Sequence, residues 1–237
     1  MLHRKWVAVL KINEIFFSIQ GEGKLAGVPS VFIRTTGCNL RCTWCDSPST
    51  SWKPEGDDVG VEEVLDRVSD HPAVHAVLTG GEPLLAHGVE ELTHRLRESG
   101  YHLTVETAGT IWKDIVCDLA SISPKLSNST PWEREDGRLA ERHERQRLNL
   151  PIIRRFMALP DYQLKFVVDR PEDVTDIDAV LCELGDFDPA DVLLMPQGVT
   201  PEELNHRGPW IAELCKRRGF RFCPRLHIGL YGNTRGT

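Results

Sequence analysis

Apolar and polar positions follow two periods along this chain. Apolar runs of four to eight residues, rich in Val, Ile, Leu and Phe, have the composition of buried strands. Between them lie segments with helical spacing, such as Val61, Val64 and Val68, and Gly100 and Gly219 follow two of these segments as stops. The pattern predicts strands over Ile12–Ile19, Val28–Arg34, Val74–Thr79, Tyr101–Thr107, Ile115–Ile122, Gln163–Val168, Val192–Met195 and Arg221–Ile228, and helices over Val61–Ser69, Val89–Ser99, Pro171–Leu184 and Pro201–Arg218.

Two polar stretches interrupt this pattern. Ser49–Gly60 contains Pro54 and Gly56 and is predicted to be a loop. Leu126–Gln146 is rich in Glu, Arg and His, which is typical of a solvated loop or helix face. We therefore expect one domain over residues 1–237, with a charged loop or insert near residues 126–155.

Strands that alternate with helices favour an α/β fold with parallel strands and right-handed crossovers. About six strand–helix units are too few for a closed eight-stranded barrel. We therefore expect a partial, open TIM-like barrel with its site at the C-terminal strand ends. The segments that directly follow strands, and so would meet there, are Gly37–Ser47, Gly80–Pro83, Thr107–Gly109, Ser123–Lys125 and Pro196–Gly198.

Charge and composition narrow the possible partners. The 237 residues carry a net charge of −7, which argues against general nucleic-acid binding through basic patches. Met1–Leu10 does not resemble a signal peptide, and no apolar run approaches the roughly 20 residues that span a bilayer. We expect a cytoplasmic protein with neither a membrane nor a nucleic-acid partner.

The cysteines are concentrated in one loop. Of seven, three stand at CxxxCxxC spacing as Cys38, Cys42 and Cys45, and in a reducing compartment they favour metal or catalytic use. Three thiolates can hold three irons of a [4Fe–4S] cube and leave the fourth open for chemistry. Trp44 can shield such a cluster and offer a flat face to an adenine. A structural zinc site and ordinary buried thiols are the alternatives; the remaining cysteines, Cys117, Cys182, Cys215 and Cys223, are interpreted as buried thiols.

Two glycine-rich breaks add candidate ligand contacts. Gly80–Pro83 reads GGEP after an apolar strand, where glycines let backbone groups face a ligand. Gln20–Gly23 contains two glycines, which fits either a backbone close to a ligand or a plain turn.

CxxxCxxC followed by GGEP resembles the radical S-adenosylmethionine (SAM) superfamily, and further segments are similar to the 7-carboxy-7-deazaguanine synthase family. The resemblance spans nearly the whole chain, and the Gln-Gly-Glu-Gly element is more specific to this family than the cysteine motif. The segments that carry it are Ile15–Gly23, Val31–Arg34, Gly37–Ser47, Thr79–Pro83, Ser123–Lys125 and Leu226–Asn233.

The resemblance implies an enzyme that converts 6-carboxy-5,6,7,8-tetrahydropterin to 7-carboxy-7-deazaguanine with loss of ammonia, in the pathway to queuosine, archaeosine and related compounds. It implies a radical SAM fold and three cofactors: a [4Fe–4S] cluster on Cys38, Cys42 and Cys45, SAM, and Mg²⁺. It also implies a small-molecule pterin substrate, an electron donor such as a flavodoxin or ferredoxin, and a homodimer.

Site residues are implied by the same resemblance, position by position, with no catalytic side chain beyond the cluster ligands. Ser47 matches the magnesium ligand, which is most often threonine in the family, and keeps the hydroxyl oxygen that suits Mg²⁺. The charged stretch from Leu126 to Arg155 is longer than in compact members. The implied SAM contacts are Trp44, Gly81, Ser123, Pro124, Lys125, Met195, Pro196, Gln197 and Gly198, and the implied substrate contacts are Ile19, Gln20, Gly21, Arg34, Thr79 and Thr237.

Two other functions stay open on the sequence. Another radical SAM enzyme, such as a glycyl-radical activase, shares the cysteine motif but has no need of Gln20–Gly23. A zinc-stabilised binding module explains the cysteines but leaves GGEP without a role.

Overall fold

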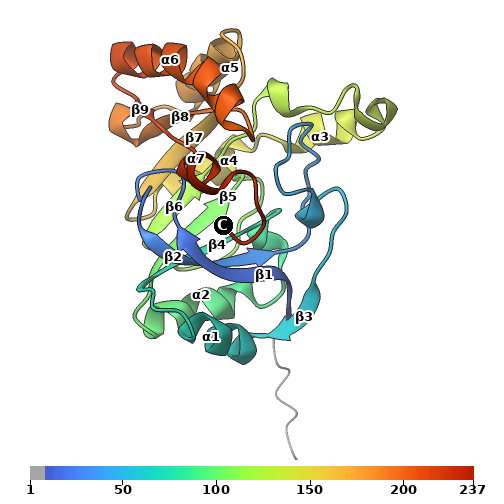
Figure 1. The fold of residues 1–237 in the computed structure, drawn as a ribbon. Helices are drawn as coiled ribbons and strands as arrows, with labels where there is room; N and C mark the ends of the chain where they lie inside the picture. Colours follow the sequence, from blue (N-terminus) through green and yellow to red (C-terminus); the bar gives the residue numbers. More distant parts are fainter. Residues whose placement is uncertain (1–8) are drawn as a thin grey trace, which may run out of the picture.

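In the computed structural model, which describes residues 9–237, the strands form one nine-stranded sheet in the order β3-β1-β2-β4-β5-β6-β7-β8-β9 (Figure 1). Most of Met1–Leu10, for which no signal peptide is expected, lies outside the described residues. The strands are β1 (Val9–Ile19), β2 (Pro29–Thr35), β3 (Asp57–Gly60), β4 (His75–Gly80), β5 (His102–Thr107), β6 (Leu119–Ile122), β7 (Tyr162–Val168), β8 (Val192–Pro196) and β9 (Arg221–Phe222). The helices are α1 (Val61–Ser69), α2 (Val89–Glu98), α3 (Ala140–Gln146), α4 (Leu150–Met157), α5 (Asp173–Leu184), α6 (Pro201–Arg218) and α7 (Leu226–Tyr231).

The centre of the sheet confirms the expected partial barrel. From β2 to β8, six neighbouring strands pair in parallel, with registers such as Ile33 opposite Leu78. Within the described residues β3 and β9 are the outermost strands and do not pair with each other, so the barrel is open. All C-terminal ends of the six parallel strands therefore meet at one edge.

The expectation of parallel strands is wrong for β1, which pairs with β2 antiparallel. The connection from β1 to β2 is only Gln20–Val28, closed by hydrogen bonds from Gln20 N–H to Val28 O (2.8 Å) and from Gly27 N–H to Gln20 O (2.7 Å). A hairpin of this length cannot carry the chain back to the other end of the sheet, which a parallel crossover requires.

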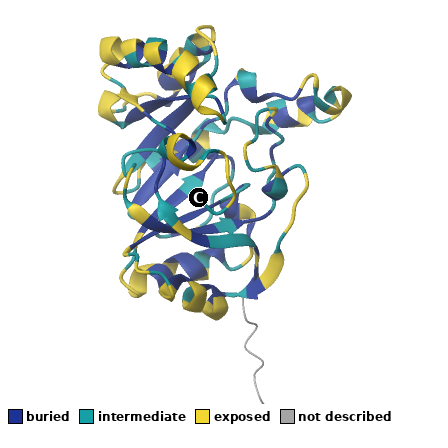
Figure 2. Cartoon of the chain, viewed as in Figure 1, coloured by how far each residue is buried: buried dark blue, intermediate teal, exposed yellow. Residues whose placement is uncertain are grey.

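Alternation along the strands separates two faces of the sheet. The outward side chains, such as Ile33, Leu78 and Phe166, are fully buried and belong to the main apolar core, which the helices cover (Figure 2). Each such side chain contributes roughly 1.5–3 kcal/mol on burial. Inward positions on the same strands carry polar residues, among them Arg34 and Thr79. The sheet is thus apolar toward its helices and polar toward its concave side.

Three predicted element boundaries are wrong. The loop predicted over Ser49–Gly60 ends in β3, where Asp57–Gly60 pairs with β1. This edge strand was missed because its sequence has no alternation of apolar and polar residues. The strand predicted over Ile115–Ile122 begins only at Leu119, where the ladder with β5 starts opposite Thr104. The last predicted strand stops at Phe222. Pro224 lacks the N–H that a sheet ladder needs, and Leu226–Tyr231 forms α7.

The charged stretch near residues 126–155 contains two helices, α3 and α4. α4 begins after Asn149, whose side chain accepts from Ile152 N–H and caps it, and it buries Ile153 and Phe156. α3 buries Ala140 and His143, so part of this stretch is packed rather than solvated. No helix among residues 9–237 is long and apolar enough to cross a membrane.

Candidate active site

A cavity of about 470 Å³ opens on the concave side of the sheet. Its lining comes from the loops after β2, β4, β5 and β6, from inward side chains of the strands, and from the last five residues of the chain, 233–237. In Figure 1 the C-terminus lies in front of the middle of the sheet, so the tail crosses over this space. Four of the five post-strand segments expected to cluster contribute to this lining, whereas Pro196–Gly198 does not. Inward side chains of the strands also take part.

The cysteine loop and the GGEP turn approach each other closely. Glu82 N–H donates to Gly37 O at 2.9 Å. A Cβ atom on Gly81 would lie 2.4 Å from Gly37 O and 2.7 Å from Cys38 Cβ, distances at which heavy atoms overlap. Glycine at residue 81 is thus required by contact with the loop, and its backbone lines the cavity beside the cysteines.

Glu82 joins the ends of two strands. Its carboxylate is fully buried, accepts from Ala108 N–H (3.0 Å) and Leu84 N–H (3.2 Å), and lies 2.9 Å from Thr107 Oγ1 through each of its oxygens. Burial raises the pKa of Glu82, and these hydrogen bonds oppose the rise. The contacts fix the turn after β4 to the turn after β5.

The three motif cysteines line the same cavity and pack together with Leu40, Trp44 and Ala108. Burial raises the thiol pKa of Cys38 to about 11 and of Cys42 to about 12, and it also raises that of Cys45. Among residues 9–237, no three His, Cys, Asp or Glu side chains converge as ligands of a single metal ion. The three thiols line one cavity beside each other, an arrangement that fits a shared iron–sulfur cluster.

The interpretation of the other four cysteines as buried thiols needs one correction. Cys215 and Cys223 are buried and Cys117 is partly buried, but Cys182 is exposed. Helix α5 buries Ile177, Val180 and Leu181, and residue 182 points away from that face.

The residues expected to contact SAM divide into two groups. Trp44, Gly81, Ser123, Lys125 and Met195 line the cavity. Lys125 Nζ donates to Ser123 Oγ at 2.8 Å and lies 5.9 Å from the centre of the Trp44 ring, so these residues form one patch beside the cysteines. Four further residues, Pro124, Pro196, Gln197 and Gly198, do not line the cavity.

The residues expected to contact substrate all line the cavity: Ile19, Gln20, Gly21, Arg34, Thr79 and Thr237. Two of them converge on Glu106, an inward residue of β5. Gln20 Nε2 donates to one Glu106 oxygen at 3.3 Å, and Thr79 Oγ1 donates to the other at 3.2 Å. The three side chains come from β5, from β4 and from the turn after β1, so the fold of the sheet brings them together.

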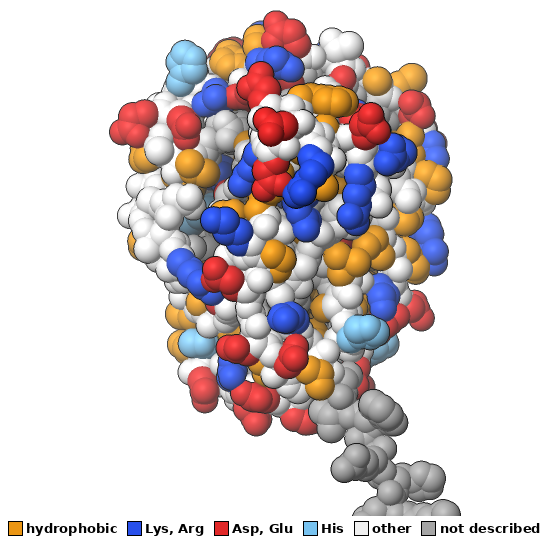
Figure 3. Space-filling view, turned by 90° about the vertical axis from the view of Figure 1, so that its right-hand side faces the viewer, with side chains coloured by type: hydrophobic (Ala, Val, Ile, Leu, Met, Phe, Trp, Pro, Cys, Tyr) orange, Lys and Arg blue, Asp and Glu red, His pale blue; other side chains and the backbone are white. Residues whose placement is uncertain are grey.

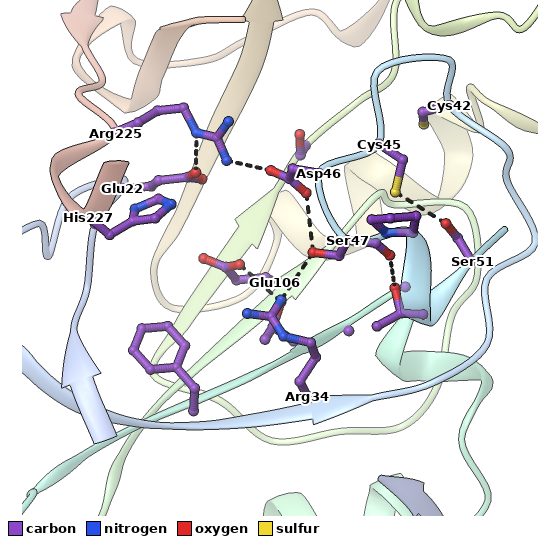
Figure 4. A pocket seen from close by; sticks show the side chains of 18 of the residues that line it. Glu22, Arg34, Cys42, Cys45, Asp46, Ser47, Ser51, Glu106, Arg225 and His227 are labelled. Atoms are coloured by element: carbon purple, nitrogen blue, oxygen red, sulfur yellow. Dashed lines mark hydrogen bonds and ion pairs between the residues drawn. The ribbon is translucent and has the colours of Figure 1, made fainter. Parts of the chain in front are cut away.

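A chain of polar contacts crosses the cavity. Figure 4 shows it running from Glu22 through Arg225, Asp46 and Ser47 to Arg34. Arg225 Nε donates to Glu22 at 2.9 Å, and Ser47 Oγ lies 3.2 Å from Asp46 Oδ1 and 3.4 Å from Arg34 Nη1. The cysteine loop is thereby connected to the C-terminal segment on one side and to β2 on the other.

Lys165 lies close to two carboxylates that line the cavity, those of Glu22 and Glu106. It ion-pairs with Glu22 and lies 3.8 Å from Glu106, and its side chain is only 6% exposed. Burial alone would raise the pKa of Glu22, but the charges of Lys165 and Arg225 outweigh burial and lower that pKa. The same carboxylates raise the pKa of Lys165 against its own burial. Both groups are therefore charged at neutral pH.

His227 touches the turn after β1. A Cβ atom on Gly21 would lie 1.8 Å from His227 Nδ1, so only glycine fits beneath the imidazole. Burial lowers the pKa of His227 against the opposing charge of Glu22. The double glycine of Gln20–Gly23 thus serves a close approach inside the site rather than a plain turn.

Several charged residues of the cavity were not singled out from the sequence. Lys165 and Glu106 carried a usable signal, because each is the one Lys, Arg, Asp or Glu residue of its strand. Glu22 and His227 lie within quoted motifs. Asp46 also lies within such a motif, Gly37–Ser47. Arg225 gave no signal, since its pairing with Asp46 joins residues 179 positions apart.

An open barrel with three cysteines in the loop that follows β2 defines a radical SAM protein. The Radical SAM superfamily model matches residues 32–126. The 7-carboxy-7-deazaguanine synthase of Rhodopirellula baltica is 46% identical over 229 residues, which cover 96% of this chain and 89% of that protein. The synthase of Halobacterium salinarum is 46% identical over 237 residues, covering 94% and 91%. The chain belongs to the 7-carboxy-7-deazaguanine synthase family.

Solved structures agree with this assignment. The crystal structure of QueE from Escherichia coli superposes with a TM-score of 0.67 at 26% identity, covering 91% of this chain and 93% of that one. Streptococcus suis SuiB bound to its precursor peptide SuiA has a TM-score of 0.55 at 11% identity, which indicates a shared fold alone. Membership of the radical SAM superfamily implies a [4Fe–4S] cluster and SAM.

Proposed function

We propose that this protein converts 6-carboxy-5,6,7,8-tetrahydropterin to 7-carboxy-7-deazaguanine and ammonia. One observation carries the proposal: a single cavity is lined by three cysteine thiols on one side and by a network of paired cations and carboxylates on the other. A groove for a protein substrate is not needed to account for these residues, so a glycyl-radical activase is not favoured.

The residues of the cavity fit the cofactors. Cys38, Cys42 and Cys45 would hold the cluster, and Lys125 would offer a cation to the carboxylate of SAM, with the Trp44 ring beside it. When bound, the cluster and SAM supply the radical that abstracts hydrogen from the substrate. The side chains of this chain bind and orient the substrate and keep water away from it.

Substrate recognition is assigned to the polar side of the cavity. The Glu106 carboxylate would accept hydrogen bonds from the amino and ring N–H groups at one edge of a pterin, while Gln20 and Thr79 hold it in place. Arg34 would supply a countercharge for the substrate carboxylate, because it faces the cavity and its partner Glu14 engages only Nε, at 2.7 Å. The tail, including Thr237, would cover the bound substrate.

Magnesium is proposed to bind at Ser47. Its hydroxyl lies between Asp46 and Arg34 on the cavity wall, where oxygen ligands and a carboxylated substrate would meet. Mg²⁺ keeps several waters and recruits substrate oxygens, so one protein hydroxyl and a nearby carboxylate are sufficient support.

An acidic electron donor, such as a flavodoxin or ferredoxin, is the proposed partner. Residues 126–155 carry seven arginines against five Asp and Glu residues, in a chain of net charge −7. Figure 3 shows Lys and Arg side chains gathered on the upper part of the face that carries α3 in Figure 1. A cytoplasmic location fits seven unpaired thiols, and a homodimer is expected from the family.

Anaerobic reconstitution followed by assay with the tetrahydropterin tests the function. Substrate deuterated at C6 should yield 7-carboxy-7-deazaguanine, and deuterium should accumulate at the 5′ position of SAM. Cys42→Ala should lose all turnover, whereas Cys182→Ala, an exposed thiol outside the cavity, should keep it. Cleavage of SAM without deuterium transfer would reject the substrate and leave the enzyme class intact.

A further inference from the structure

A segment outside the cavity contacts both spacers of the cysteine motif. We call residues 127–147, which include α3, the α3 arm. Thr43 N–H donates to Ser129 O at 2.8 Å, Trp44 Nε1 donates to Asn128 O at 3.0 Å, and Arg134 Nη1 donates to Thr43 O at 3.1 Å. These contacts fix the spacer between Cys42 and Cys45.

The other spacer is fixed by His143. This residue of α3 is 1% exposed, and its Nδ1 lies 3.0 Å from Arg41 N, in the spacer between Cys38 and Cys42. Because a backbone N–H can only donate, Nδ1 must be the unprotonated nitrogen. Nε2 then carries the proton and donates to Ser129 Oγ at 2.9 Å, and Ser129 Oγ donates in turn to Leu126 O at 2.7 Å.

This relay has one consistent direction. Each hydrogen has one acceptor, from Arg41 N–H through the imidazole and the Ser129 hydroxyl to a backbone carbonyl. The histidine is therefore held in a single tautomer, by Arg41 N–H of the cysteine loop on one side and by Ser129 Oγ of the arm on the other. The hydrogen bonds described between the arm and the cysteine loop go to Arg41, Thr43 and Trp44, and none of them engages a cysteine thiol.

We propose that the α3 arm sets the conformation of the cysteine loop before the cluster is inserted, and that His143 is the positioning residue that fixes the Cys38–Cys42 spacer. This explains why a charged stretch of the chain folds against the loop and buries a histidine there. The effect on the cluster rests on the proposed function, in which the cysteines bind that cluster. The contacts between the arm and the loop do not, because the chain forms them alone.

The test begins with the full-length chain before reconstitution, so it does not depend on the proposed activity. In His143→Phe, hydrogen exchange of the backbone amides of residues 38–45 should become about fivefold faster, the factor expected for one lost net hydrogen bond. His143→Asn keeps an acceptor near the position of Nδ1 and should return exchange close to wild type. Ser129→Ala, a milder change, should accelerate exchange in the same direction by a smaller factor.

After anaerobic reconstitution, His143→Phe should lose iron to a chelator about fivefold faster than wild type, and the electron paramagnetic resonance spectrum of its reduced cluster should change. His75→Phe is the matched control. His75 is also buried, at 2% exposed, and also has two partners, Ser30 Oγ at 2.5 Å and Thr104 Oγ1 at 2.9 Å, but it lies on β4 and does not line the cavity.

His75→Phe should destabilise the fold while leaving the exchange of residues 38–45 and the spectrum as in wild type. If the two Phe variants behave alike at the loop, or if His143→Asn does not restore slow exchange, His143 stabilises the fold generally and the proposal is wrong. If His143→Phe does not fold, unchanged exchange in Ser129→Ala would overturn it equally.

Discussion

Replacing Gly81 with alanine tests whether the GGEP turn supports the cysteine loop by direct contact. The added methyl would stand 2.4 Å from Gly37 O and 2.7 Å from Cys38 Cβ. Non-bonded carbon atoms are optimally about 3.5–4.0 Å apart, so each of these two distances would have to grow by about 1 Å to become an ordinary contact. The backbone of residue 81 carries no positive φ, so the steric clash is the whole of the perturbation.

The magnitude follows from two terms. Overpacking of this kind costs typically 1–3 kcal/mol. Moving the two loops apart by about 1 Å would also stretch the 2.9 Å bond from Glu82 N–H to Gly37 O beyond hydrogen-bonding range, which costs about 1 kcal/mol. The free energy of unfolding should therefore fall by about 2–4 kcal/mol, and for a chain of this length the melting temperature should drop by about 5–15 °C.

Thermal and denaturant unfolding of the iron-free protein measure the loss, and iron content after anaerobic reconstitution measures its effect on the cysteines. Gly229→Ala is the matched control, because no heavy atom lies within 4 Å of the added methyl and residue 229 is within α7. That variant should be unchanged or slightly more stable. A Gly81→Ala protein that melts within about 1 °C of wild type and binds full iron would refute the close contact.

Two further predictions concern the polar side of the cavity. Ser47→Ala should keep its iron but lose the stimulation of turnover by Mg²⁺; if titration with Mg²⁺ gives the wild-type response, residue 47 is not a ligand. Glu22→Gln should lower the free energy of unfolding at pH 7, because the lowered pKa of Glu22 means that its ionised form stabilises the fold above its unfolded pKa of 4.5. The difference from wild type should shrink as the pH falls below 4.5, and a difference that stays constant from pH 7 to pH 3 would contradict the assigned ion pairs.

The sequence by itself determined the elements that rest on local chemistry. Apolar positions at strand or helix spacing predicted most strands and helices, because an element that buries one face repeats apolar residues at a fixed period. The spacing of Cys38, Cys42 and Cys45 predicted that one loop brings three thiols together, and all three line the same cavity, since neighbouring residues need no distant partner to be brought together. The same reasoning failed for β3 and for the end of the chain, where short edge elements carry little apolar periodicity.

Only the tertiary structure decided which charges meet. Glu22 pairs with Lys165 and Arg225, residues 143 and 203 positions away, and no local pattern specifies such pairs. They are formed by the order of the strands and the curvature of the sheet, which turn alternate side chains of distant segments into one concave space. The sequence places His143 in a charged stretch, and only the packing of α3 against the cysteine loop makes it a buried acceptor for Arg41 N–H. Local periodicity encodes which face is buried, whereas the partner on that face depends on contacts that exist only after the chain has folded.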